Sequence, residues 1–554
     1  MAPPPMPPRP ASPRAPASAS ASAPFQAAAT ATPAANARAA WLPRALALLP
    51  ALGFLIIVLA PPLNHDVAAV LDFSARMLAG ERLYTGLVDV NPPLIFLLNL
   101  PAAWLAAHTP LDGPRALLLG LLLLCAGVLA LCRALGHAEG ARPAGAAERA
   151  VTGAALPLLL LAAGYDFGQR EHIMAVAALP YLVLAERRIG GAATPWRLAA
   201  PAVLLAALGF ALKPHFLAAP ALVEAVVLGA GLARGRGAAV LRDPVPWAMA
   251  GLWALYLAAI PVFFPDYLGH VVPLVWQWYV GLDGAPWWRV LLTPVLGSGA
   301  LFVLGLAALV PAAMRRAPLG WLPALLLAAA AGGLLAALVQ HKGWSYHLVP
   351  VWLWGGWACA LLLGRGADAL LPAAPARRAA PLLAAGAAFA LALLALRGDQ
   401  SPWIQFRFAA GPPGQLTEWL EREAGDSRVL VLSPDIAPAY PAINYAGARS
   451  ILPFMSLWLL QSTYQRCPES GARYRAAWEM SRAEFTVFRT VAERLARTPP
   501  AAVLVSRYTG MPACGGAPFD FIAYFRRHPL FESAWAQYRN WGEIDGYQLF
   551  VREE

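Results

Sequence analysis

The stretch NHDVAAVLDFSARMLAGERLYTGLVDVNPPL, residues 64–94, lies directly after the first long apolar run of the chain. Asp66 stands at the expected boundary between membrane and water, where a carboxylate is unfavourable unless it is paired or used. The residues that follow have the apolar spacing of a helix that ends near Gly80. The stretch then returns to apolar sequence through Asn91-Pro92-Pro93. We therefore expect a loop between membrane segments with an acidic side chain at its entry.

The composition is that of a membrane protein. Of the 554 residues, 59% are hydrophobic and 13% are charged, and apolar runs of about 20 residues recur through most of the chain. The formal net charge of +11 comes with arginines in short loops between apolar runs, as the positive-inside rule requires. Basic and aromatic residues do not gather on one soluble module, so the sequence predicts membrane lipids and not nucleic acid as partners.

The apolar runs predict about eleven crossings of the membrane. Arg38 and Arg44 precede the first run and place the N-terminus in the cytoplasm, so an odd number of crossings puts the C-terminal part outside. The run 94–107 is short, and we interpret it as a half-inserted or tilted helix. The expected spans lie near residues 45–62, 115–132, 151–164, 173–185, 198–212, 216–232, 246–263, 291–311, 320–339, 348–364 and 380–397.

Three regions follow from this pattern. Residues 1–40 are rich in Ala, Pro and Ser, cannot bury a core, and are expected to form a disordered cytoplasmic tail. Residues 41–397 form a transmembrane domain, and residues 398–554 carry regular charge. The predicted fold is an α-helical polytopic membrane protein of about 11–12 spans with a C-terminal extracytoplasmic α/β domain. The elements predicted in that domain are strands at 428–433, 500–506 and 546–552 and amphipathic helices at 416–424 and 482–497.

Two of the five cysteines, Cys467 and Cys514, lie in the C-terminal region. If that region is outside the cytoplasm, the two can form a disulfide, and the sequence leaves open whether they do. No Cys/His spacing typical of a metal site occurs.

The unusual polar motifs sort to one face of the membrane. They lie in the loops without an arginine excess, and polar residues scattered only for packing would not sort by side. We therefore expect them to line one outward-facing cavity. The motifs are Asn64-His65-Asp66, Asp89-Val90-Asn91-Pro92-Pro93, the run from Tyr165 to His172, Lys213-Pro214-His215, Pro265-Asp266-Tyr267 and the run from Gln340 to His347.

Asp66 has two interpretations. Transfer of a sugar with inversion needs a carboxylate that takes the proton of the acceptor hydroxyl, and a departing phosphate whose charge is stabilised. An acid at the end of a membrane span, facing a cavity, suits the first task. However, Asp is also a favoured helix N-cap and Asp66 begins a helix-like segment, so a purely structural cap is the alternative.

The ionisable residues near 166–172 and at 213–215 also have two interpretations each. Asp166, Arg170, Glu171 and His172 either line a wet cavity or form a solvated hairpin with an internal Arg–Glu pair. Lys213, which precedes Pro214 and His215, is either an anion ligand or a lysine whose charged end reaches the membrane surface.

The strongest cationic group comprises His341, Lys342, Tyr346 and His347, with Gly343 and Ser345 allowing a tight turn between two spans. Such a loop could grip a phosphate head group, or its aromatic residues could form an interfacial belt. The aromatic residues around Asp283, at 276–288, likewise indicate an interfacial belt, with stacking on a sugar as the alternative.

The first loop resembles that of the GT-C glycosyltransferases, in the branch of the protein mannosyltransferases and aminoarabinose transferases. The similarity rests on Asp66, the segment Ala75-Arg76-Met77-Leu78-Ala79-Gly80, Leu83-Tyr84 and Pro92-Pro93-Leu94. Beyond residues 64–97 the match is architectural and covers roughly residues 40–554, including the many spans and the outer C-terminal domain.

The resemblance implies an inverting glycosyltransferase that uses a polyprenyl-phosphate-linked sugar. It implies that Asp66 is the catalytic base and that the Pro-Pro-Leu turn lies near the donor phosphate. Many members carry a lysine before Pro-Pro, whereas this chain has Asn91, which cannot supply positive charge. We therefore assign the donor phosphates to Arg170, Lys213, His341 and Lys342. Further substrate contacts are assigned to His65, Asp89, Asn91, Glu171, His172, His215, Tyr346 and His347.

Some members of the superfamily use a divalent metal ion. Asp66, Asp89 and Glu171 could offer oxygen ligands to Mg²⁺ or Mn²⁺, but nothing in their spacing demands it, and no metal ligand or cofactor is assigned.

The sequence therefore predicts a glycosyltransferase of the bacterial inner membrane with a periplasmic C-terminal domain. Its acceptor would be a lipid, a polysaccharide or a protein of the envelope. Two other classes of function remain. A lipid or glycan transporter or flippase would place polar groups on both sides or at mid-span and show an internal repeat. A non-catalytic envelope assembly protein would not need the clustered acid, lysines and histidines.

Overall fold

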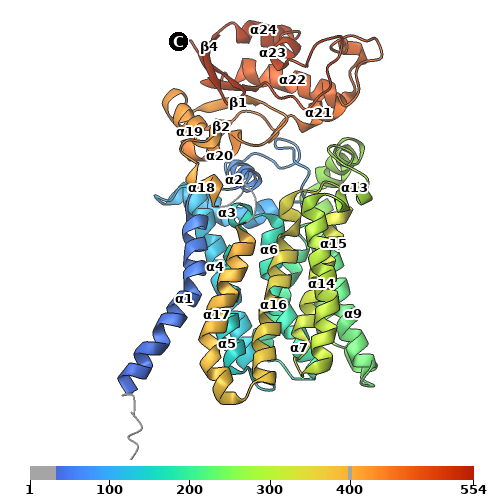
Figure 1. Cartoon of the computed structure of the whole chain (residues 1–554). Helices are drawn as coiled ribbons and strands as arrows, with labels where there is room; N and C mark the ends of the chain where they lie inside the picture. The colour runs from blue at the N-terminus through green and yellow to red at the C-terminus, as the bar shows by residue number, and fades with distance from the viewer. Residues whose placement is uncertain (1–32, 397–401, 554) are drawn as a thin grey trace, which may run out of the picture. The chain divides into compact units, whose positions relative to one another are not determined.

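The computed structural model describes residues 33–396 and 402–553 (Figure 1). The chain divides into two units, residues 1–42 and 43–554. Helix α1 (Pro33–Leu59) begins within the segment expected to be disordered, whose residues 1–32 lie outside the described residues.

Long apolar helices make up the membrane part of the chain. In the described residues, eight helical segments are long and apolar enough to cross a membrane, which confirms a multi-pass membrane protein. They are Leu42–Leu59, Gly113–His137, Pro214–Leu232, Gly237–Phe263, Pro294–Arg316, Leu322–Val339, Ser345–Leu370 and Ala373–Ala395.

The remaining expected spans fall on shorter helices. The runs at 151–164 and 198–212 correspond to α5 (Ala146–Leu161) and α8 (Trp196–Phe210), and the run at 173–185 is divided between α6 (Arg170–Ala177) and α7 (Leu179–Gly190). Helix α3 (Leu94–His108) has 15 residues and is about 22 Å long, less than the ~30 Å hydrocarbon core. The short run at 94–107 is thus a helix too short to cross upright.

The other helical elements of the membrane part fall between or within these spans. They are α4 (Gly113–His137), η1 (Gly164–Asp166), η2 (Pro214–Leu217), α9 (Ala218–Leu232), α10 (Gly237–Leu241), α11 (Pro244–Phe263), η3 (Tyr267–Val271), α12 (Val272–Leu274), η4 (Val275–Tyr279), α13 (Trp287–Leu291), α14 (Pro294–Arg316), α15 (Leu322–Val339), η5 (Ser345–Leu348), α16 (Val349–Leu370) and α17 (Ala373–Ala395).

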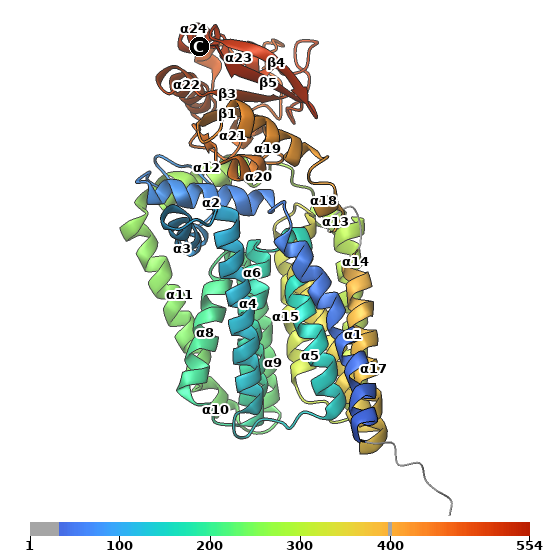
Figure 2. The same cartoon turned by 90° about the vertical axis from the view of Figure 1, so that its left-hand side faces the viewer.

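Helix α2 (His65–Leu78) lies across the end of the helix bundle, between the bundle and the C-terminal domain (Figures 1 and 2). The hydroxyl of Tyr440 donates a hydrogen bond to Asp72 at 3.1 Å, and Arg76 donates to the backbone carbonyl of Leu452 at 2.8 Å. The sequence predicts this helix to residue 80, close to its observed end. Both bonds join the second half of α2 to the C-terminal domain.

The C-terminal domain contains a five-stranded mixed sheet in the order β2-β1-β3-β5-β4. Strand β1 is parallel to β2 and β3, whereas β5 is antiparallel to β3 and β4. The predicted strands correspond to β1, β3 and β5, and β2 and β4 are additional. The strands are β1 (Arg428–Leu432), β2 (Arg449–Ser450), β3 (Ala502–Ser506), β4 (Tyr538–Ile544) and β5 (Tyr547–Arg552).

Helices cover both faces of this sheet. Alternate residues of a strand point to opposite faces, so Val429 and Val431 pack in a cluster shared with the membrane part, whereas Leu430 and Leu432 pack in a second cluster with α22. The two predicted amphipathic helices correspond to α19 and α22. The helices of the domain are α18 (Trp403–Phe406), α19 (Pro412–Glu423), α20 (Ala439–Ala446), α21 (Trp458–Thr463), η6 (Ala477–Glu479), α22 (Arg482–Arg497), α23 (Phe521–Phe525) and α24 (Pro529–Trp535).

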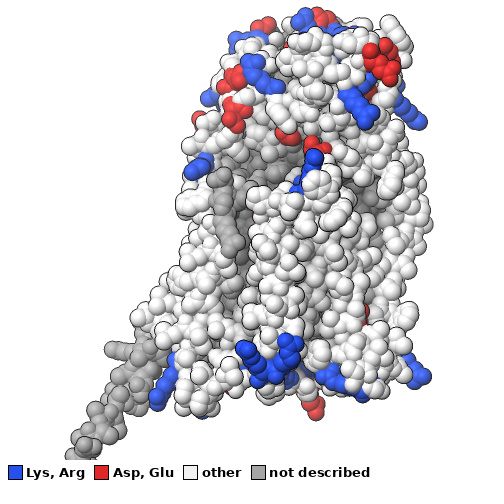
Figure 3. Space-filling model, turned by 45° about the vertical axis from the view of Figure 1, so that its right-hand side comes forward, with Lys and Arg blue, Asp and Glu red and all other residues white. Residues whose placement is uncertain are grey.

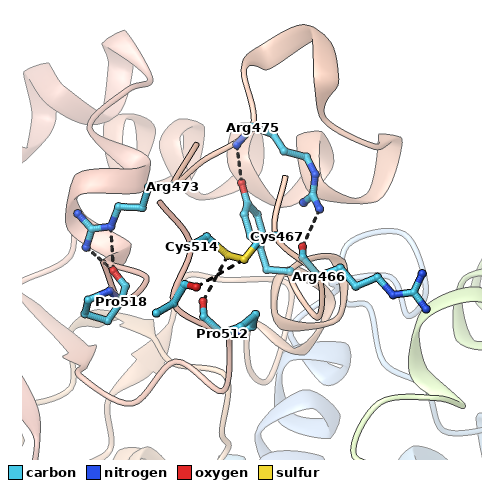
Figure 4. The surroundings of a disulfide bond; sticks show 9 residues. Arg466, Cys467, Arg473, Arg475, Pro512, Cys514 and Pro518 are labelled. Carbon is cyan, nitrogen blue, oxygen red and sulfur yellow. Dashed lines mark hydrogen bonds between the residues drawn. A yellow bond between two sulfur atoms is a disulfide. The ribbon is translucent and has the colours of Figure 1, made fainter. Parts of the chain in front are cut away.

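Cys467 and Cys514 form a disulfide, with their Cα atoms 5.4 Å apart (Figure 4). The bond joins the loop after α21 to the loop after β3. Beside it, Arg473 donates to the carbonyl of Pro518 at 2.8 Å. The pairing that the sequence left open is thus present.

Charged side chains are concentrated at two levels of the molecule. Figure 3 shows Lys and Arg at the end of the helix bundle away from the C-terminal domain and again on that domain, with a broad uncharged band between. At the first of these levels, Arg365 donates to Glu148 at 2.7 Å and to Glu186 at 2.8 Å, and Arg188 donates to Glu224 at 2.6 Å. Loops rich in arginine therefore meet at one end of the bundle, as the charge pattern predicts.

Candidate active site

Asp66 lies in the first turn of α2 but does not cap the helix. The N-cap is Asn64, whose side-chain oxygen accepts from the backbone N–H of Asp66 at 2.9 Å. The carboxylate of Asp66 instead accepts from the side chain of Gln169 at 3.0 Å and lies 3.3 Å from Nη2 of Arg170. The cap interpretation of Asp66 is therefore wrong, because a neighbouring amide does that work and leaves the carboxylate for other partners.

Charge around Asp66 favours its ionised form. Burial alone would raise its pKa, but His65, Arg170 and the hydrogen bond from Gln169 together hold the pKa of this carboxyl below its ordinary value. His65 lies with Nε2 3.8 Å from Asp66, and its Nδ1 is 2.9 Å from the hydroxyl of Tyr165. Asp66 is thus a carboxylate at neutral pH, 17% of its side chain is exposed, and it can accept a proton.

Two amide side chains fix the entry of α2 against the loop before α6. Gln169 donates to Asn64 at 2.9 Å, and Asn64 donates to Asp166 at 3.2 Å. Burial, together with Glu171 and Asp66, raises the pKa of Asp166 to about 7. Sequence reasoning placed Asn64 and Gln169 in polar motifs but gave neither a role, because an uncharged amide in a loop carries no signal of burial.

Arg170 connects Asp66 to the turn before α3. Its Nη1 donates to the side-chain oxygen of Asn91 at 2.6 Å. Asp89 in turn accepts from the backbone and the side chain of Asn91 at 2.8 and 2.7 Å, and Tyr84 donates to the backbone carbonyl of Asn91 at 2.7 Å. Where the GT-C resemblance implies a lysine, this chain therefore has an oxygen that orients a buried arginine.

Glu171 pairs with Lys213 and not with its neighbour Arg170. The ammonium of Lys213 donates to Glu171 at 2.7 Å and to Gln340 at 3.2 Å, and it lies 5.6 Å from the ring centroid of Tyr346. Lys213 is buried, so the interpretation that its charged end reaches the membrane surface is wrong. Arg170 and Glu171 are also buried and pair with other residues, so the interpretation as a solvated hairpin with an internal Arg–Glu pair is wrong too. The pair brings three outer motifs of the sequence together.

Lys342 enters the same region from the loop between α15 and η5. Its ammonium donates to the carbonyls of Leu282 and Tyr279 at 2.8 and 3.3 Å and lies 3.8 Å from the ring centroid of Tyr279. Burial lowers the pKa of Lys342 to about 8; Asp283 opposes this shift and Lys213 adds to it. In the described part of the chain Lys342 forms no ion pair, so its charge is available to a ligand.

The histidines do not share one role. The ring of His172 lies 2.7 Å from the carbonyl of Leu160 and accepts from the backbone N–H of Gly168, so the structure ties it to the backbone and corrects its assignment to substrate. His341 contributes its backbone carbonyl, which accepts from Ala285 at 3.0 Å, and within the described ranges its side chain has no partner.

His347 and His215 are the remaining histidines assigned to substrate. His347 is buried and packs against Tyr346 with ring centroids 4.6 Å apart. Nε2 of His215 and both ring nitrogens of His347 are buried without a hydrogen-bond partner among the residues described. They are therefore polar groups of the interior near Lys213, and their role in substrate binding stays a prediction.

The arrangement does not fit a divalent metal. Across residues 33–396 and 402–553, no group of three or more His, Cys, Asp or Glu side chains is placed to hold an ion. Asp66 and Glu171 instead pair with Arg170 and Lys213. A metal ion would have to displace these positive side chains to bind the two carboxylates.

Two cavities differ in their relation to these residues. A small pocket is lined by Asp66, Gln169 and Arg170, together with Asn99 of α3 and apolar side chains of α2 and α3. A larger open cleft of about 1060 Å³ lies at the edge of the sheet, between Arg428, Arg449 and carboxylates of the same domain, and contains none of the predicted site residues. Of these two cavities, the small pocket is the one that contains predicted site residues, and we take it as the candidate active site.

Comparison with known proteins gives a likeness in fold. No protein-family model matches the sequence, and no curated protein matches it. Among solved structures, the chain is similar to ArnT from Cupriavidus metallidurans, whose crystal structure has undecaprenyl phosphate bound to that protein. The TM-score is 0.55 with 14% identity, and the match covers 92% of this chain and 97% of ArnT. At this identity the likeness shows the fold, and it supports the architecture that the GT-C resemblance implies.

Proposed function

We propose that this protein is an inverting glycosyltransferase that moves a sugar from a polyprenyl-phosphate donor to an acceptor hydroxyl. The observation that carries the proposal is the 3.3 Å contact between Asp66 and Arg170, beside a small pocket and in an ArnT-like fold. It joins a proton acceptor and a fixed positive charge, the two groups that such a transfer requires. The undecaprenyl phosphate bound to ArnT supports a polyprenyl phosphate as the donor carrier.

In the proposed reaction, Asp66 takes the proton of the acceptor hydroxyl as the oxygen attacks the anomeric carbon. The bond between that carbon and the phosphate oxygen breaks on the opposite side, and its electron pair leaves with the polyprenyl phosphate. Inversion follows from this single displacement. The ionised state of Asp66 suits the role of base, because a carboxylate that has already lost its proton is ready to accept one.

The leaving phosphate gains negative charge, which Arg170 in the pocket wall and the lysines beyond it stabilise. Arg170 and Lys342 are the proposed main contacts, the first because it already faces Asp66 and the second because it has no ion-pair partner within the described chain. Lys213 is matched by Glu171, so it contributes to the field of the site and reaches the phosphate only if that pair opens. His341 has the weakest support as a phosphate ligand.

The proposed location is the bacterial inner membrane, with the N-terminus in the cytoplasm and the C-terminal domain in the periplasm. The arginine-rich loops meet at the end of the bundle away from that domain, which supports this orientation through the positive-inside rule. The acceptor is then an envelope lipid, polysaccharide or protein.

Glycan analysis of the cell envelope tests the proposal. In a deletion strain we expect one sugar to disappear from an envelope glycan and to return with the wild-type gene. Asp66→Asn should not restore it, because an amide cannot take the proton. Asp72→Asn is the matched control, since Asp72 lies on the same helix and is also buried but faces Tyr440 and Arg76.

Restoration of the sugar by a folded and inserted Asp66→Asn protein would refute the role of Asp66. An unchanged envelope in the deletion strain, combined with no transfer from any polyprenyl-phosphate sugar by the purified protein, would refute the enzyme and favour a transporter or an assembly protein.

A further inference from the structure

Two loops carry groups that place the cations of the candidate site, and neither loop is held by the membrane helices alone. The loop 279–285 supplies the carbonyl oxygens that fix Lys342. The loop 83–91 supplies Asn91, which accepts from Arg170 at 2.6 Å. The positions of both cations therefore depend on where these loops lie.

Both loops pack into the same hydrophobic cluster of the C-terminal domain. Leu282 is only 4% exposed and belongs to the cluster that contains Leu432 and Trp458. Val88 and Val90, on either side of Asp89, pack against this cluster as partly buried side chains. The ring of Tyr279 meets the ring of Trp458 edge to face, with centroids 5.3 Å apart, which is favourable beyond the buried area.

Hydrogen bonds join one segment of the domain, residues 452–462, to the loop 83–91 and to Trp278, the residue directly before the loop 279–285. We call this segment the docking segment. The carbonyl of Pro453 accepts from the backbone N–H of Val88 at 2.7 Å, and the hydroxyl of Ser462 donates to the carbonyl of Trp278. The docking segment is itself tied to the end of β1, because the N–H of Leu457 donates to the carbonyl of Ser433 at 2.7 Å. A rigid sheet thus fixes the segment that holds the loops.

We propose that the docking segment positions Lys342 and Arg170 for the donor phosphate, with Trp458 as the central positioning residue. The C-terminal domain is then part of the donor site and not only a module for the acceptor. The proposal rests on the proposed function for the identity of the ligand, but the geometry of Lys342 does not depend on it. Loosening Trp458 should disturb the cations and leave the base Asp66 in place, because Asn64 and Gln169 also hold Asp66.

The test compares Trp458→Ala with Trp478→Ala in the full-length protein. Trp458 is 8% exposed, whereas Trp478 is 87% exposed on the turn Ala477–Glu479 of the same domain and serves as the control. The first readout is the pH profile of acylation of the Lys342 amine, followed by mass spectrometry. The second is the affinity for polyprenyl phosphate alone.

In the wild type, we expect the midpoint of acylation near pH 8, because burial depresses the pKa of Lys342. In Trp458→Ala the loop opens to water, so the midpoint should move upward toward the value of a free lysine, about 10.4. Affinity for polyprenyl phosphate should fall roughly tenfold, the loss expected when one well-placed charged hydrogen bond becomes mobile. Trp458→Phe, which keeps an edge-to-face ring contact, should restore most of the low acylation midpoint and most of the affinity for polyprenyl phosphate. Trp478→Ala should match the wild type in both.

An unchanged midpoint and an unchanged affinity in folded Trp458→Ala would overturn the proposal and would leave the domain as a separate module. If Trp458→Ala does not fold, Ser462→Ala removes one docking hydrogen bond and is judged by the same two readouts. A shifted midpoint in a protein whose wild type does not bind polyprenyl phosphate would refute the proposed ligand and leave the positioning of Lys342 supported.

Discussion

The ammonium of Lys213 lies 2.7 Å from a carboxylate oxygen of Glu171, and both side chains are buried. The two residues are 42 positions apart, and Glu171 is the direct neighbour of Arg170, which turns instead to Asp66. Successive residues on a helix differ in direction by about 100°, so one dipeptide at the start of α6 serves two different ion pairs. The site therefore contains matched charges, and among the residues that the structure describes there, Lys342 is a cation that a negatively charged ligand meets without first displacing a carboxylate.

Breaking the Glu171–Lys213 pair should destabilise the protein more than removing both charges. We expect Glu171→Gln and Lys213→Met each to lose about 3–5 kcal/mol, because each leaves one buried charge unpaired, and the double variant to regain most of it. Thermal unfolding in detergent with a double-mutant cycle measures the coupling. The control is Glu493→Gln, which breaks pairs with Arg489 and Arg497 on the surface of α22 and should cost less than about 1 kcal/mol. Single variants as stable as the wild type would show that the pair does not form.

The sequence predicts the membrane part well because its signals are local. A long apolar run must be a helix in lipid, and arginine in the intervening loops indicates the side. The sequence does not predict strand β4, because Tyr538–Ile544 contains several polar residues and no apolar alternation. It also contains Gly542, where the pairing register with β5 is irregular. Strand β2 has only two residues and no pattern of its own.

The candidate site could be predicted as a set of residues but not as a set of contacts. Asp66, Arg170 and Lys213 are conspicuous because charge beside apolar sequence is unfavourable unless it is used. Which charge faces which is decided by packing across distant segments, and the contact from Arg170 to Asp66 spans 104 positions. Gln169, which donates to Asp66, gave no signal because amides are common in loops. The assignment of His341 to the donor phosphates likewise rests on its neighbours in sequence, which do not indicate where its side chain points.

Replacement of Arg170 by glutamine should shift the pH dependence of transfer. Burial raises the pKa of Asp66, while His65, Arg170 and Gln169 lower it below its ordinary value. Transfer needs the ionised carboxylate, so activity is lost as the pH falls through that pKa. Without Arg170 the pKa of Asp66 rises, and we expect the acid limb of the rate profile to move to higher pH. Arg115→Gln, at an exposed arginine that pairs with Asp112, is the control and should leave the limb in place. A uniform loss of rate at every pH would show that Arg170 does not tune Asp66.

Affinity for polyprenyl phosphate should depend on the protonation of Lys342. The pKa of this ammonium is lowered to about 8 by burial, so the positive charge is present below that pH and lost above it. We expect roughly tenfold weaker binding at pH 9 than at pH 7, since about one molecule in eleven then keeps the charge. Lys342→Arg should abolish this dependence, because guanidinium stays charged throughout the range, and Lys342→Met should bind weakly at every pH. Binding by the wild type that does not change between pH 7 and pH 9 would exclude Lys342 as the phosphate contact.

The disulfide allows the side of the membrane to be measured. Cys467 and Cys514 close a loop over a separation of 47 residues, and their replacement by serine should cost about 2–4 kcal/mol. In intact cells whose outer membrane has been opened, an impermeant reductant followed by an impermeant maleimide should label both cysteines if the C-terminal domain is periplasmic. Cys359→Ser, at a free cysteine, should change neither result. Because Tyr440 of this domain donates to Asp72 on α2, the domain and the helix that carries Asp66 meet at one end of the bundle. Labelling only after the inner membrane is permeabilised would therefore move the proposed reaction to the cytoplasmic face along with the domain.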